Sequence, residues 1–154
     1  MSVVGEQHAA RQDAGRIHHI VLAYRDAARQ LAARQRFTEI LGIDDWVDLG
    51  VIEAGHVAVV VSWSSGLELL APTGPGSILD DHLAAHGEGF YSLVFGVDDL
   101  EASVDRAKAA GTSVYRLPRP PERAFERFTV AREAVLGEIG AIDVILGEFV
   151  TQPG

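Results

Sequence analysis

Four polar side chains stand inside apolar segments of this sequence, at positions where they could do chemistry. They are His19 in RIHHIVLAY, Glu68 in GLELLAP, Ser92 in GFYSLVFGV and Asp143 in AIDVILG. An imidazole beside a carboxylate can pass protons to and from a substrate as an acid–base pair. The same two groups are common ligands of divalent metals, whereas a serine hydroxyl is a poorer ligand than imidazole. The question is which elements bring these side chains together.

The four segments belong to an internal repeat. HIVLAYRDAARQL, from His19, aligns with SLVFGVDDLEASV, from Ser92, and GLELLAP aligns with AIDVILG. Each copy predicts a strand, a helix, two further strands and a closing strand. The repeat therefore predicts an α+β fold of two βαβββ modules. Side chains alternate between the faces of a strand, so one polar residue of each strand can face a shared site.

Both predicted helices carry recognisable signals. In the second module, Asp98 and Glu101 form a capping box before an apolar stripe. In the first module, the helix ends at Gly42, and four apolar residues are expected to supply its apolar positions: Leu31, Phe37, Ile40 and Leu41.

The chain divides into four parts within one domain. Residues 1–15 read as a flexible tail, and 16–72 form the first module. Residues 73–88 are a linker with a short helix, and 89–150 form the second module. The tail lacks an apolar signal core, so we expect a cytoplasmic protein. The segment RLPRPPERAFERF reads as a surface loop or lid.

Composition excludes several classes of function. The chain has 22 acidic and 13 basic residues, a net charge of −9, so we expect no nucleic-acid partner. No apolar run is long enough for a membrane helix, so no membrane partner is expected. With no cysteine, thiolate chemistry and cysteine-based metal centres are excluded.

The order of the motifs resembles the vicinal oxygen chelate superfamily, which includes glyoxalases, bleomycin-resistance proteins and extradiol dioxygenases. The motifs are IHHI at 17–20, ELLAP at 68–72, GEGFYSLVFGVDDLE at 87–101 and IDV at 142–144. Their combination is most similar to proteins of the methylmalonyl-CoA epimerase type. The resemblance implies that the two modules form an open, cup-shaped mixed β-sheet barrel, and that the protein is a homodimer.

The resemblance also implies a set of site residues. The first and closing strands of each module supply ligands to a divalent metal, here Zn, Co, Ni, Mn or Fe. On this sequence the metal ligands are His19, Glu68 and Asp143, and the same three are the candidate catalytic residues. Ser92 departs from the pattern, which has a histidine there, and becomes a candidate substrate-binding residue. The metal site is therefore either degenerate or absent.

Two functions follow from this comparison. The first is an isomerase or lyase, resembling the epimerase branch, that acts by proton transfer on a small oxygenated or acyl-CoA-type substrate. The alternative is a metal-free protein that binds and sequesters a small molecule, as antibiotic-binding members do. The roles of His56, Glu53 and Tyr91 stay open, because each could line the site or replace the missing ligand.

Overall fold

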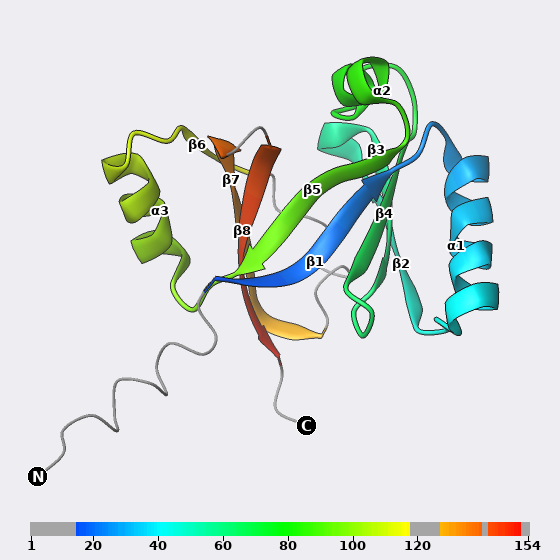
Figure 1. Ribbon diagram of the computed structural model, residues 1–154, viewed down its shortest axis with the longest axis horizontal. Coiled ribbons are helices and arrows are strands. Elements are labelled where there is room, and N and C mark those ends of the chain that lie inside the picture. Colours follow the sequence, from blue (N-terminus) through cyan, green and yellow to red (C-terminus); the bar gives the residue numbers. More distant parts are fainter. Residues whose placement is uncertain (1–14, 118–126, 140–141, 152–154) are drawn as a thin grey trace, which may run out of the picture. The chain divides into compact units, whose positions relative to one another are not determined.

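The computed structural model describes residues 15–117, 127–139 and 142–151 (Figure 1). Its elements, in order, are β1 (Arg16–Ala23), α1 (Ala27–Leu41), β2 (Trp46–Ile52), the 3₁₀-helix η2 (Glu53–Gly55), β3 (Val57–Ser62), β4 (Leu67–Pro72), α2 (Asp80–His86), β5 (Gly89–Gly96), α3 (Leu100–Ala109), β6 (Val114–Arg116), β7 (Phe128–Ile139) and β8 (Ile142–Thr151). The predicted α+β class with two βαβββ modules is confirmed. Almost all of the predicted tail and most of the proline- and arginine-rich loop lie outside the described residues.

The contacts divide the described chain into two compact units. The N-terminal unit comprises residues 19–93, and the C-terminal unit comprises residues 15–18, 94–117 and 127–151. Strands β1 and β5 run from one unit into the other, so each unit contains one part of each strand. No helix within the described ranges is both long enough and apolar enough to span a membrane.

In the N-terminal unit the strands are hydrogen-bonded in the order β2-β3-β4-β1-β5. Strand β1 is parallel to β4, whereas β3 is antiparallel to both β2 and β4. Valine-rich β3 is buried along nearly its whole length, as expected for a strand with a neighbour on each side. Helix α1 packs mainly against β4, and its N-cap is Asp26, whose carboxylate accepts a hydrogen bond from the Arg29 backbone N–H.

The prediction that four apolar residues form the buried face of α1 is wrong for three of them. Leu31, Ile40 and Leu41 are more than half exposed, and the only buried residue of the helix is Gln30. The Gln30 side-chain amide donates hydrogen bonds to the carbonyl of Leu69 (2.6 Å) and that of Ala58 (3.2 Å). A polar side chain that satisfies two strand carbonyls therefore connects α1 to the sheet.

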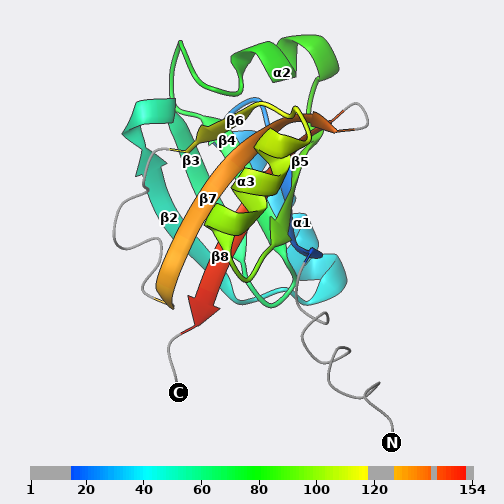
Figure 2. The ribbon, with the colours of Figure 1, turned by 90° about the vertical axis from the view of Figure 1, so that its left-hand side faces the viewer.

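In the C-terminal unit the order is β1-β5-β8-β7-β6, and α3 lies across β7 and β8 (Figure 2). The helix contributes to a core whose buried members are Leu100, Val104, Ala134, Leu136, Val144 and Leu146. Its N-cap is Asp99, one residue later than the predicted Asp98; the Asp99 carboxylate accepts from the Ala102 backbone at 3.0 Å. Glu148 on β8 accepts from the Leu100 backbone at 2.9 Å and so holds the start of α3.

Candidate functional site

His19 and Glu68 are brought together on neighbouring strands of the N-terminal unit. His19 lies on β1 and Glu68 on β4, and the His19 Nε2 and Glu68 Oε2 atoms are 3.0 Å apart. The His19 side chain is 1% exposed and that of Glu68 is 19% exposed. The imidazole is therefore buried, while the carboxylate keeps a surface that a small molecule can reach.

The parallel register explains this contact. Val21 on β1 is the direct partner of Glu68, so their side chains project from the same face. His19 precedes Val21 by two positions and shares that face, which makes it the diagonal neighbour of Glu68. The pair follows from strand pairing rather than from a loop, so we expect its geometry to be well fixed.

Trp63 packs against the imidazole of His19. It follows the last residue of β3, and its ring meets that of His19 at 90° with centroids 5.8 Å apart. The contact fixes the orientation of the imidazole from the side of the β3–β4 turn. Sequence reasoning missed Trp63 as a member of the site, because an aromatic residue at the end of a strand is usually part of a core.

Ser92 is buried on β5, the other neighbour of β1, and is 2% exposed. The two strands run in opposite directions, and the Gly15 backbone N–H donates to the Gly96 carbonyl at 3.0 Å. Ser92 and His19 therefore lie on adjacent strands, and both side chains are buried.

Asp143 lies in the C-terminal unit, at the start of β8, and is exposed. Its charge is felt by Tyr115: burial raises the pKa of that phenol above its usual value, and Asp143 raises it further. The roles of Asp143 as a catalytic residue and a metal ligand stay predictions.

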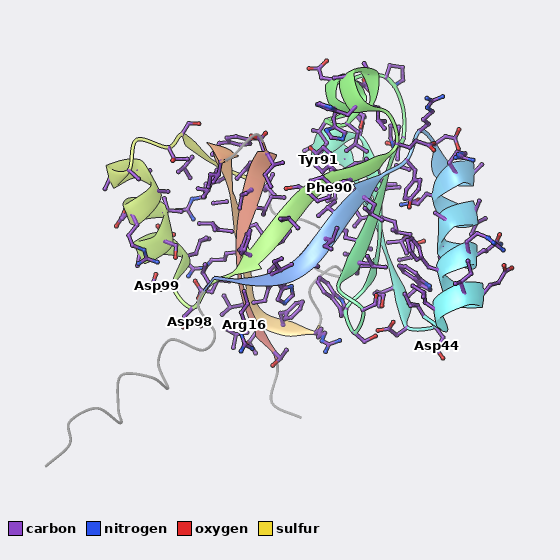
Figure 3. All side chains as sticks on the ribbon, viewed as in Figure 1. Arg16, Asp44, Phe90, Tyr91, Asp98 and Asp99 are labelled. Carbon is purple, nitrogen blue, oxygen red and sulfur yellow. The ribbon has the colours of Figure 1, made fainter. Side chains whose placement is uncertain are left out.

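The residues with open roles occupy other positions. His56 is exposed and has a left-handed backbone (φ 46°) directly after η2, which contains Glu53. Tyr91 contacts α2: its ring lies edge-on to His82 at 4.8 Å, near the start of β5 (Figure 3). His82 Nε2 is also 3.0 Å from the Phe90 carbonyl oxygen. Tyr91 therefore takes part in the packing between α2 and β5.

A charged contact missed by sequence reasoning lies where β1 ends and β5 begins. Arg29 on α1 donates to both carboxylate oxygens of Glu88, with the shortest contact 2.8 Å, and the Arg25 backbone donates to the same group at 3.1 Å. The hydrogen bond from Arg29 holds the pKa of Glu88 below its usual value, while burial opposes the shift. Because 59 residues separate the two partners, no local pattern could have indicated the pair.

A divalent metal, which the resemblance implies, does not fit these donors. The pair offers one imidazole and one carboxylate, and the neighbouring strand adds only a hydroxyl. Among the residues that the structure describes, no group of three or more histidine, aspartate or glutamate side chains could hold a metal ion. Non-haem iron sites of the simplest type need two histidines and one carboxylate. The 3.0 Å separation of His19 Nε2 and Glu68 Oε2 places one imidazole beside one carboxylate.

Comparison with known proteins agrees with this fold. A sequence model described as "Glyoxalase/Bleomycin resistance protein/Dioxygenase superfamily" matches residues 18–131. The chain belongs to this superfamily. Its match to the family confirms the resemblance seen in the motifs, and the match includes His19, Glu68 and Ser92 but ends before Asp143. No curated protein matches the sequence.

Solved structures of similar fold include methylmalonyl-CoA epimerases. A variant of the Streptomyces coelicolor enzyme, in complex with 2-nitronate-propionyl-CoA, is 24% identical with a TM-score of 0.71, and the match covers 91% of this chain and 99% of that one. A methylmalonyl-CoA epimerase in complex with methylmalonyl-CoA and NH4+ is 23% identical, with a TM-score of 0.71 and the same coverage. The Mycobacterium tuberculosis epimerase is 20% identical, with a TM-score of 0.68 and coverage of 90% and 89%. At these identities the likeness shows the fold.

Proposed function

We propose that this protein is an isomerase or lyase that moves a proton on a small oxygenated or acyl-CoA-type substrate. The observation that carries the proposal is the contact between His19 and Glu68. A buried imidazole and a partly exposed carboxylate, 3.0 Å apart, form a candidate acid–base pair. The carboxylate is the member that a substrate can reach. The epimerases of similar fold, some of them bound to acyl-CoA ligands, support the acyl-CoA class.

In the proposed reaction Glu68 removes the proton next to the substrate carbonyl. The C–H bond breaks, the proton joins the carboxylate, and the electron pair moves to the carbonyl oxygen as an enolate. Glu68 then returns the proton to carbon, and its return to the opposite face of the planar enolate completes an isomerisation. The buried His19 imidazole acts on the Glu68 carboxylate and does not touch the substrate. In a lyase, the enolate instead expels a leaving group from the neighbouring carbon. We assign Ser92 to hydrogen bonding with the substrate oxygen, where its hydroxyl would stabilise the developing charge.

The decisive experiment measures hydrogen exchange in D₂O with a panel of acyl-CoA thioesters that have an acidic proton beside the carbonyl. Wild type should incorporate deuterium, and Glu68→Gln should lower the rate by about 10²–10⁴-fold. Glu39→Gln, an exposed carboxylate on α1, is the matched control and should keep the wild-type rate. Circular dichroism confirms that each variant is folded.

The proposal fails if folded Glu68→Gln exchanges as fast as wild type. Tight binding of a small molecule by wild type, without exchange of any substrate in the panel, would favour the sequestration function instead. The prediction for Asp143 is tested in the same assay, where Asp143→Asn should also slow exchange if the aspartate takes part. A homodimer and a cytoplasmic location stay predictions, and sedimentation equilibrium tests the first.

A further inference from the structure

We propose that the pair of His19 and Glu68 works without a metal ion, and that Ser92 is the position at which a metal-binding site is incomplete. This inference rests on the proposed function and specifies its chemistry. It depends on the strand register, which identifies the positions in the second module that correspond to His19 and Glu68.

The helix caps align the first strands of the two modules. Asp26 caps α1 and Asp99 caps α3, and both carboxylates accept from the backbone three residues on. Counting back from each cap by the same number of residues gives His19 in the first module and Ser92 in the second. The structural alignment therefore agrees with the sequence repeat on this pair.

The hydrogen bonds to the closing strands align those strands differently from the sequence repeat. The Tyr24 backbone donates to the Leu70 carbonyl at 2.9 Å, and the equivalent Val97 donates to the Gly147 carbonyl at 2.9 Å. Leu70 thus corresponds to Gly147, and two residues earlier Glu68 corresponds to Ile145. Ile145 is 9% exposed and cannot bind a metal ion. By register, the second module offers a hydroxyl and an alkyl group at the positions where the first offers an imidazole and a carboxylate.

One substitution within the N-terminal unit should supply the missing metal ligand. His19, Glu68 and Ser92 lie on three adjacent strands in the order β4, β1, β5, and Ser92 is buried next to the strand of His19. An imidazole at position 92 would add a second histidine to the existing histidine and carboxylate. That donor set is the triad of two histidines and one carboxylate that binds divalent iron and related metals.

The test compares metal binding by wild type and Ser92→His. Elemental analysis after incubation with Co²⁺, Ni²⁺ or Zn²⁺ and gel filtration should find no bound metal in wild type and one ion per chain in the variant. At a metal concentration about 100 times Kd, the Tm of the variant should rise by about 5–10 °C. The Tm of wild type should be the same with the metal and with EDTA.

Trp63 provides a local reporter of the same event. The chain has two tryptophans, and Trp63 is the one in contact with His19. In a Trp46→Phe background, Co²⁺ should quench the Trp63 fluorescence of Ser92→His and leave that of the parent unchanged. Ala32→His, which adds an imidazole on the exposed side of α1, controls for adventitious binding and should show no quenching. Adding His19→Ala to Ser92→His should abolish it.

The outcomes separate the two proposals. Stoichiometric metal in wild type, with a lower Tm in EDTA, would overturn the inference. A folded Ser92→His that binds no metal would overturn the place given to Ser92. If that variant does not fold, Ser92→Asp also adds a metal ligand at position 92. The Tm of Ser92→Asp should then rise in the presence of metal, and an unchanged Tm would contradict the inference. Because metal and Tm are measured without substrate, absent turnover would count against the proposed function alone.

Discussion

At the scale of single residues, Gly147 shows how tightly one aromatic group is placed in the C-terminal unit. A Cβ atom at this position would overlap the ring of Phe149, which lies over the glycine. Phe149 in turn stacks on His18, with ring centroids 4.4 Å apart and planes at 25°, and contacts Phe128 at 5.3 Å. His18 therefore has a packing role in the C-terminal unit.

We predict that Gly147→Ala destabilises the protein, because Phe149 would have to leave its stack to make room for the methyl group. The expected loss is about 1–3 kcal/mol in the free energy of unfolding, measured by urea titration. The same substitution in a Phe149→Leu background should cost much less, since the ring is gone. Equal losses in both backgrounds would mean that the ring does not set the size limit at this position.

The sequence predicted the central contact of the site and missed the groups around it. His19 and Glu68 were found because a repeat gives each residue a partner position, and strand alternation then fixes the face. Trp63 and the contact between Arg29 and Glu88 depend on which loops meet in space, which no periodic pattern encodes. The sequence repeat aligns Asp143 with Glu68, whereas the strand register aligns Ile145 with Glu68. Strand alternation could not separate these two alignments, because residues 143 and 145 are two positions apart and project from the same face.

At the scale of elements, α1 is connected to the sheet by a polar side chain. The order of strands and helices followed from the repeat, but the buried face of α1 did not. Apolar spacing predicts a helix face only when that face is covered, and here Leu31, Ile40 and Leu41 are exposed while Gln30 is buried. Nothing in the sequence pattern distinguishes a buried glutamine within a helix from an exposed one.

We predict that Gln30→Met, which keeps the length of the side chain but removes the amide, lowers stability. Both hydrogen bonds to strand carbonyls would be lost, at a cost of about 1–2 kcal/mol in the free energy of unfolding. Gln35→Met, on the exposed surface of the same helix, is the control and should be within about 0.5 kcal/mol of wild type. Chemical denaturation measures both, and equal effects would show that the buried amide contributes nothing special.

The contact between Glu88 and Arg29 should give stability a definite dependence on pH. The pKa of Glu88 is lowered in the folded state, so its contribution is complete above the unfolded-state pKa and disappears as pH falls through the folded-state value. Glu88→Gln lacks this contribution at every pH. The Tm difference between wild type and Glu88→Gln should therefore be largest near pH 7 and shrink below about pH 4. A difference that stays constant down to about pH 2.5 would contradict the assignment.

At the scale of the whole molecule, the charge balance opposes folding. The net charge is −9, and the described ion pairs of Arg36 with Glu39 and Arg116 with Glu101 have mostly exposed side chains. Exposed pairs contribute little, whereas the repulsion among excess carboxylates acts over the whole chain. Composition alone predicted this property, because net charge does not depend on the fold.

We predict that screening by salt stabilises the protein. Raising KCl from about 10 mM to about 150 mM shortens the Debye length from roughly 30 Å to 8 Å. The Tm should rise by about 2–4 °C over this range, measured by differential scanning calorimetry. A fall in Tm would show that attractive pairs, including Arg29 with Glu88, outweigh the overall repulsion.

The sharing of β1 and β5 between the two units limits how the chain can be divided. The repeat modules begin at these strands, but the compact units change over within them, after His18 on β1 and after Leu93 on β5. A fragment that ends at Pro72 would keep β4 and lose the β5 neighbour of β1. A gene cut at the repeat boundary would therefore encode a first half whose β1 lacks its β5 neighbour and a second half whose β5 lacks β1.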